Sequence, residues 1–152
     1  MKKSLFAGAT AVLLLLFTGC NLSGDEPKMP FPENEQKVAI EDGNVIHIVY
    51  AGYTRRITCY YYDKNDVFGY VRVETTYYTV SEAQLAYQDM EKRIQEEELE
   101  GQIRGTALKD NTVIIEYTRE HDEEKYGNLS AEELKAKIEE FINNPPSNTE
   151  NL

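Results

Sequence analysis

Residues 45–62 read VIHIVYAGYTRRITCYYY, and this stretch decides the fold of the chain. Valine, isoleucine, threonine and tyrosine dominate two runs on either side of Ala51-Gly52-Tyr53, and these residue types are typical of β-strands. A short glycine-containing connection between two such runs favours an antiparallel pair. The segment therefore predicts the centre of an antiparallel sheet.

The chain on either side of this pair continues the same pattern. Asp42-Gly43-Asn44 is a strong turn signal before the first run, and Asp63-Lys64-Asn65-Asp66 is another after the second. Each turn separates segments that are rich in β-branched and aromatic residues. The predicted strands lie at residues 37–41, 45–50, 55–62, 67–79, 102–108 and 112–118.

Two helices are predicted where the period of the apolar residues changes. Ser81 begins the first, at about residues 82–99, and Ser130 begins the second. In both cases Gln or Glu three residues later completes a capping box. Pro145-Pro146 ends the second helix. The order ββββαββα with short turns predicts an α+β fold, an antiparallel β-meander with two helices packed on one face.

The N-terminus carries a different signal. Lys2 and Lys3 precede an apolar run from Leu5 to Phe17, and Phe17-Thr18-Gly19-Cys20 closes it with small residues before a cysteine. A positive start, a short apolar stretch and a small-residue end form the layout of an export signal. The run has 13 residues, fewer than the roughly 20 of a membrane-spanning helix. A cleaved signal is therefore favoured over a permanent anchor.

Residues 17–20 resemble a lipobox, where bacterial lipoprotein signals are cut before a cysteine that becomes acylated. Gly19-Cys20 fits the motif, although Phe17 stands where leucine is usual. The resemblance implies lipidation of Cys20, for example by palmitate, and several acyl chains hold a protein stably on a bilayer. An ordinary secretory signal is the alternative. The resemblance predicts an extracytoplasmic protein, anchored by its lipid to the cell membrane or an outer membrane.

The polar segment after Cys20 contains Pro27, Pro30 and Pro32 and is predicted to be flexible. The whole chain is thus divided into a signal peptide at 1–19, a lipidated tether at 20–36, one α+β domain at 37–143 and a disordered tail at 144–152. This layout, over residues 1–142, resembles the small YehR-like bacterial lipoproteins, whose role is unknown. Apart from Gly19-Cys20, the resemblance lies in the order of the elements. It therefore implies a fold but no binding or catalytic site.

The chain is strongly acidic. Its formal net charge of −11 becomes −13 when Lys2 and Lys3 leave with the signal. Such a surface repels nucleic acid, so we expect no nucleic-acid partner. Solubility alone explains the charge, and cation binding is the alternative.

Alternation along the strands divides their side chains between two faces. The inward face, covered by Leu134, Ile138 and Phe141, is predicted to carry Ile46, Ile48, Ile57, Cys59, Tyr61, Val71, Val73, Val113, Ile115 and Tyr117. The opposite face is a candidate binding face, with His47, Arg56, Tyr60, Tyr62, Tyr70, Arg72, Glu74 and Tyr78. Tyrosine offers a large rigid surface with a hydroxyl group, which suits binding. Strand propensity alone also explains tyrosines on a solvated sheet.

Residue types that carry chemistry are few. Once Cys20 is acylated, Cys59 is left alone, so no internal disulfide forms, and we expect a buried thiol. Residues 120–124, EHDEE, are predicted to be a solvated connection, since no zinc or calcium spacing surrounds them. The two histidines, His47 and His121, accompany no Gly-x-Ser-x-Gly motif and no phosphate loop. We therefore expect no catalytic residue, cofactor or metal.

Three functions remain open. The leading expectation is a non-enzymatic binding or adaptor module of the bacterial envelope with an envelope protein as partner. The second is a lipoprotein that binds a small molecule or a glycan. The third is a hydrolase of envelope polymers that uses paired carboxylates.

Overall fold

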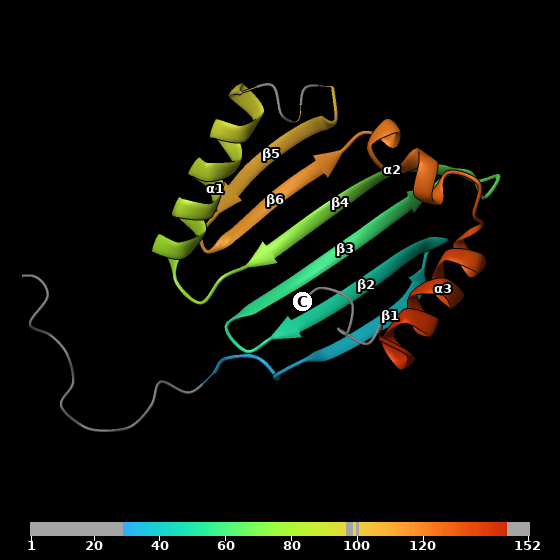
Figure 1. Cartoon of the computed structure of the whole chain (residues 1–152), viewed down its shortest axis with the longest axis horizontal. Coiled ribbons are helices and arrows are strands. Elements are labelled where there is room, and N and C mark those ends of the chain that lie inside the picture. Colours follow the sequence, from blue (N-terminus) through green and yellow to red (C-terminus); the bar gives the residue numbers. More distant parts are fainter. Residues whose placement is uncertain (1–28, 97–98, 100, 146–152) are drawn as a thin grey trace, which may run out of the picture.

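The structure is a computed structural model that describes residues 29–96, 99 and 101–145. The described residues form a six-stranded antiparallel sheet and three helices, and Figure 1 shows the helices on one face of the sheet. The predicted α+β class is therefore confirmed. The elements are β1 (Glu35–Glu41), β2 (Asn44–Ala51), β3 (Thr54–Tyr62), β4 (Phe68–Thr76), α1 (Val80–Gln95), β5 (Ile103–Lys109), β6 (Thr112–Tyr117), α2 (Arg119–Tyr126) and α3 (Ala131–Asn143).

The sheet order is β1-β2-β3-β4-β6-β5. The first four strands form a meander, and β6 rather than β5 pairs with β4, so β1 and β5 are the two edges. A bulge interrupts the pairing of β5 with β6 between Ile103 and Gly105. The sheet therefore has an irregular edge at β5.

Tight turns join the strands of the meander where the sequence predicts them. Asp42 and Gly43 both have positive φ, 51° and 77°, as a two-residue type I′ hairpin requires. The carboxylate of Asp63 accepts hydrogen bonds from the backbone N–H groups of Asn65 (2.8 Å) and Val67 (3.0 Å). These local bonds set the register of the meander.

Two helix starts follow the same capping rule, with one correction. Ser130 caps α3 as predicted, and its hydroxyl accepts a bond of 3.2 Å from the backbone N–H of Glu133. The cap of α1 is Thr79 with Glu82, not Ser81. Thr79 has the same spacing to an acidic partner, and a carboxylate also favours the positive end of the helix.

The acidic segment 120–124 is mostly exposed, as predicted, but it is a helix rather than a loop. It forms most of α2, whose N-cap residue Thr118 makes no side-chain capping bond. The segment contains no apolar residue that would give a helical period. α2 contacts the sheet through Tyr126, which packs against the core, and through His121, which stacks on Tyr117.

The predicted tether ends too late at residue 36. The Phe31 N–H donates to the Gly52 carbonyl, and the Gly52 N–H donates to the Pro32 carbonyl, both at 3.1 Å. β1 then begins at Glu35. Residues 1–28, which include Cys20, and residues 146–152 of the predicted tail lie outside the described residues.

The core consists of two clusters on the helix side of the sheet. The larger lies under α2 and α3 and contains Val45, Tyr60, Phe68, Val71, Val73, Ala131 and Leu134. The smaller lies under α1 and contains Ala83, Val113 and Ile115. Tyr117 packs against both clusters. No helix within the described ranges is long and apolar enough to cross a membrane.

Candidate ligand-binding groove

The predicted binding residues do not share one face. Directly paired residues in an antiparallel sheet project to the same side, and Tyr60 pairs with the buried Val71. The face under the helices therefore receives His47, Arg56, Tyr60 and Tyr62. The open face receives Tyr70, Arg72 and Glu74. Tyr78 lies before α1, edge-to-face with Tyr53 at 5.5 Å between ring centroids.

The inward assignment is correct for β4 and β6 and wrong for β2 and β3. Both alternating sets of β2 are rich in aliphatic residues, so its pattern does not identify the covered face. Val45 is 0% exposed and Tyr60 is 8% exposed under the helices, whereas Ile46 and Ile57 are half-buried on the open face. Cys59 also lies there, half-buried and paired in register with Ile46.

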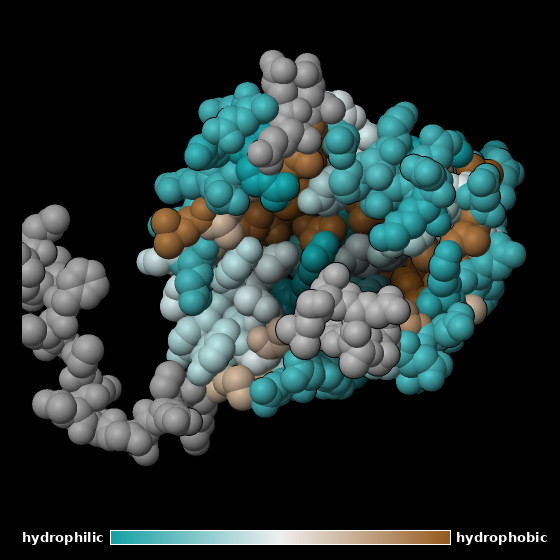
Figure 2. Space-filling model, viewed as in Figure 1, coloured by the Kyte–Doolittle hydropathy of each residue, from teal (hydrophilic) through white to brown (hydrophobic). Residues whose placement is uncertain are grey.

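The helices leave the middle of their face uncovered. α1 packs on β5 and β6, α3 packs on β1 and β2, and α2 packs on β4. Figure 1 shows the resulting separation between α1 and α3 across the central strands, and Figure 2 shows a hollow with apolar side chains in its floor. This hollow is the candidate groove. It contains two adjoining pockets that share Tyr60, Lys125 and Tyr126.

The first pocket of the groove is polar and has a volume of about 200 Å³. Arg56 and Thr58 from β3 lie in its lining with Tyr117 from β6. His121 stacks on Tyr117 at 4.3 Å between ring centroids, and its Nδ1 forms a 2.6 Å hydrogen bond with Gln102 Oε1. Asp122 contributes the one carboxylate of the lining. The pocket thus offers a guanidinium group, hydroxyl groups and aromatic faces.

The second pocket is mainly apolar and has a volume of about 370 Å³. Leu134, Ile138 and Phe141 of α3 form one wall, and Tyr126 of α2 forms another. The ring of Tyr126 meets that of Tyr60 edge-to-face at 5.4 Å. His47, Lys125 and Lys137 add polar groups to this lining. The two pockets together lie in the size range of small-ligand sites.

Burial sets the protonation states in the groove. It raises the pKa of Tyr60 and of Tyr117, and nearby Arg56 opposes this rise in both. Burial and the charge of Arg56 both lower the pKa of His47. The two tyrosines therefore remain neutral hydroxyl groups, and His47 favours its neutral form at pH 7. Formal positive charge in the groove comes from Arg56, Lys125 and Lys137.

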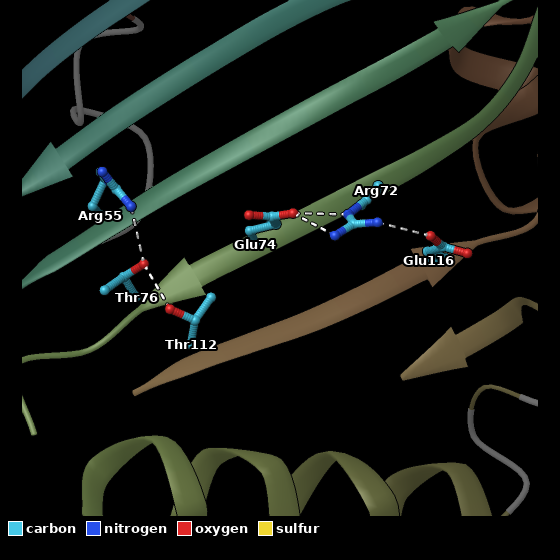
Figure 3. A network of polar contacts seen from close by, with 6 residues as sticks. All are labelled: Arg55, Arg72, Glu74, Thr76, Thr112 and Glu116. Carbon is cyan, nitrogen blue, oxygen red and sulfur yellow. Dashed lines mark hydrogen bonds and ion pairs between the residues drawn. The ribbon is translucent and has the colours of Figure 1, made fainter. Parts of the chain in front are cut away.

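Arg72 and Arg104 of the open face contact other side chains of that face. Arg72 forms an ion pair of 2.7 Å with Glu74 and one of 3.4 Å with Glu116, as Figure 3 shows. Arg104 from the bulge lies 4.3 Å from the ring centroid of Tyr70, and that ring stacks on Tyr61 at 4.3 Å. These contacts stabilise the open face, where Arg55 Nε is nevertheless buried without a hydrogen-bond partner.

The chemistry of catalysis is sparse in the part of the chain that the structure describes. No group of three or more potential metal ligands occurs there. Burial raises the pKa of the Cys59 thiol, which disfavours the nucleophilic thiolate.

The sequence singled out only some of the groove residues. His47, Arg56 and Tyr60 were predicted for binding, whereas Tyr117, Ile138 and Phe141 were predicted for the core. Lys125, Tyr126 and Lys137 carried no signal, because they meet the groove only through the positions of α2 and α3. Comparison with known proteins gives no matching family model, curated protein or solved structure. The resemblance to YehR-like lipoproteins stays a prediction.

Proposed function

We propose that the chain is a lipid-anchored extracytoplasmic binding protein that takes a small ligand in the groove. The observation that supports it most is the pair of adjoining pockets, one polar and one apolar, on the helix side of the sheet. Ligand sites combine an apolar lining with a few convergent polar groups in this way. The export signal and Cys20 support the location, since they predict a lipid anchor outside the cytoplasm.

A thermal-shift screen of metabolites, glycans and lipids with the full chain tests this function. A ligand at a hundred times its dissociation constant stabilises a protein by about 2.7 kcal/mol. Arg56→Trp should fill the groove and abolish the shift, whereas Arg55→Trp on the opposite face should leave it intact. Ligands that stabilise both variants equally would place binding elsewhere and contradict the proposal.

The lipid anchor has its own test. Metabolic labelling with palmitate should mark the wild-type chain and leave the Cys20→Ser variant unlabelled. The variant should then leave the membrane fraction. Equal labelling of both chains would contradict the lipid anchor at Cys20 but would not bear on ligand binding in the groove.

An adaptor that docks an envelope protein on the open face is the second candidate. Ile46, Ile48 and Ile57 lie half-buried there, with no helix of the described residues packed over them. Crosslinking in native membranes should then recover one envelope protein with the wild type and lose it with Ile48→Asp. If Arg56→Trp abolishes recovery of the envelope protein and Ile48→Asp preserves it, the partner binds at the groove and not on the open face.

A further inference from the structure

The groove contains an arginine that the protein itself does not neutralise. Arg56 is exposed on β3, and within the described residues no carboxylate forms an ion pair with it. Burial and, to a smaller extent, the charge of Arg56 lower the pKa of His47 in the adjoining pocket. Lys125 lines both pockets and Lys137 lines the apolar one, and Asp122, beside Arg56 in the polar pocket, is the one carboxylate in either lining. A chain with a net charge of −11 thus offers a locally positive site.

A positive site of this kind selects anions. The guanidinium group forms strong charge-assisted hydrogen bonds with carboxylates and phosphates. The neutral hydroxyl of Tyr117 and that of Thr58 line the same pocket. An anionic group fits this end of the groove better than a neutral or cationic one.

The adjoining pocket favours an apolar group of the ligand. Leu134, Ile138 and Phe141 present apolar surface along one side of α3, and the Phe141 side chain is 53% exposed. Covering this surface with an apolar group removes it from water, which is favourable at about 25 cal/mol per Å². A sugar or a free inorganic anion would leave this wall in contact with water.

One ligand satisfies both pockets. The two pockets share Tyr60, Lys125 and Tyr126 in their linings, so a molecule that extends across these residues meets Arg56 at one end and the apolar wall of α3 at the other. We propose that the groove binds a single-chain amphiphilic anion, with its head at Arg56 and its alkyl chain between Tyr126 and α3. This inference rests on the proposed function and names its ligand class.

Photocrosslinking tests the inference with the full chain in its native membranes. The probe is decanoate with a diazirine at the end of its alkyl chain, and the labelled peptides are identified by mass spectrometry. We expect labelling of Tyr126 or of residues 138–141. Unmodified decanoate should compete, whereas acetate, which lacks the chain, and decanol, which lacks the charge, should compete at least about tenfold less well. Decyl phosphate as a competitor distinguishes a phosphate head from a carboxylate head.

Two pairs of variants separate the ends of the ligand. Arg56→Gln should reduce labelling about tenfold, and Arg55→Gln, its neighbour on the opposite face, should leave labelling unchanged. Phe141→Ser should weaken labelling several-fold, while Leu85→Ser replaces a 68% exposed side chain on α1 and should have no effect. All four positions lie outside the fully buried core, and protease resistance confirms that each variant is folded.

The outcomes separate this inference from the proposed function. Labelling within the groove that depends on Arg56 and Phe141 supports both. Equal competition by decanol, or equal labelling of Arg56→Gln and wild type, overturns the anionic ligand. If decanoate does not label the groove, but another compound of the screen stabilises the wild type and not Arg56→Trp, the amphiphilic ligand is wrong and the binding function is supported. If no compound requires an intact groove for its binding, both the ligand class and the proposed binding function are wrong.

Discussion

Arg55 and Arg56 are neighbours in β3, but they lie on opposite faces of the sheet and have different surroundings. On the open face, Arg55 donates a 3.4 Å hydrogen bond to Thr76 and lies 5.8 Å from the ring centroid of Phe31. On the helix side, Arg56 has no such partner among the described residues. Neither arginine forms an ion pair among the described residues, but the side chain of Arg55 is half-buried against its own face, whereas that of Arg56 is exposed in the lining of the groove. The two faces therefore differ in how far an arginine side chain is accessible to a ligand.

The largest expected effect concerns the burial of the two faces. Phe68 is 1% exposed under the helices, so Phe68→Ala should lower the free energy of unfolding by about 3–5 kcal/mol. Ile46→Ala on the open face removes a half-buried side chain and should lower it by only about 1 kcal/mol. Urea denaturation of both variants measures the difference. Equal losses would mean that the open face is covered in solution.

A smaller effect is expected at the helix that walls the groove. Ser130→Ala removes the cap of α3 and should lower the free energy of unfolding by about 1 kcal/mol. It should also weaken decanoate labelling, because α3 carries Ile138 and Phe141. Thr79→Ala removes the matching cap of α1 and serves as the control. Loss of labelling in both variants would show a general loss of structure rather than an effect on the wall.

The ion pairs of the open face should contribute even less to the free energy of unfolding. A double-mutant cycle on Arg72 and Glu116, both about one-third exposed, should give a coupling free energy of about 0.2–1 kcal/mol. The coupling should decrease with added salt. Arg72→Ala should leave decanoate labelling unchanged. A salt-independent coupling would indicate that this face is buried against a partner.

The smallest effect should appear in the pH dependence of stability. The pKa of His47 lies below its ordinary value of 6.5, so the unfolded chain binds this proton more readily than the folded chain. Its contribution to stability is therefore lost as the pH falls below that ordinary value. His47→Gln should flatten the decline in melting temperature between about pH 7 and 5. An unchanged slope would assign the decline to other groups.

Local patterns made much of the fold predictable. The turn at Asp42-Gly43 and the capping box of Ser130 with Glu133 each depend on a few adjacent residues, so the sequence indicates them directly. The faces of β2 were not predictable, because Val45 and Ile46 are equally apolar and only the position of α3 decides which is buried. α2 was missed because Tyr126 and His121, which contact the core and Tyr117, do not form an apolar helical period.

The groove was less predictable than the strands that form its floor. Arg56 and Tyr60 were recognised as binding residues from their type and alternation, but they were placed on the same face as Arg72. Their true neighbours, Tyr126 and Phe141, lie far along the chain. They meet Tyr60 only because α2 and α3 return to the same end of the sheet, a long-range arrangement without a local sequence signal.

The bulge in β5 affects how copies of this protein behave beside one another. β5 is an edge strand, and an edge with free backbone groups is a template for strand addition and aggregation. The extra residue between Ile103 and Gly105 breaks the regular spacing that an incoming strand would need. On the other edge, Glu35, Lys37 and Glu41 of β1 place charges where an approaching chain would pair. Neighbouring copies at high local concentration would therefore remain separate, and a protein partner would have to recognise side chains rather than extend the sheet.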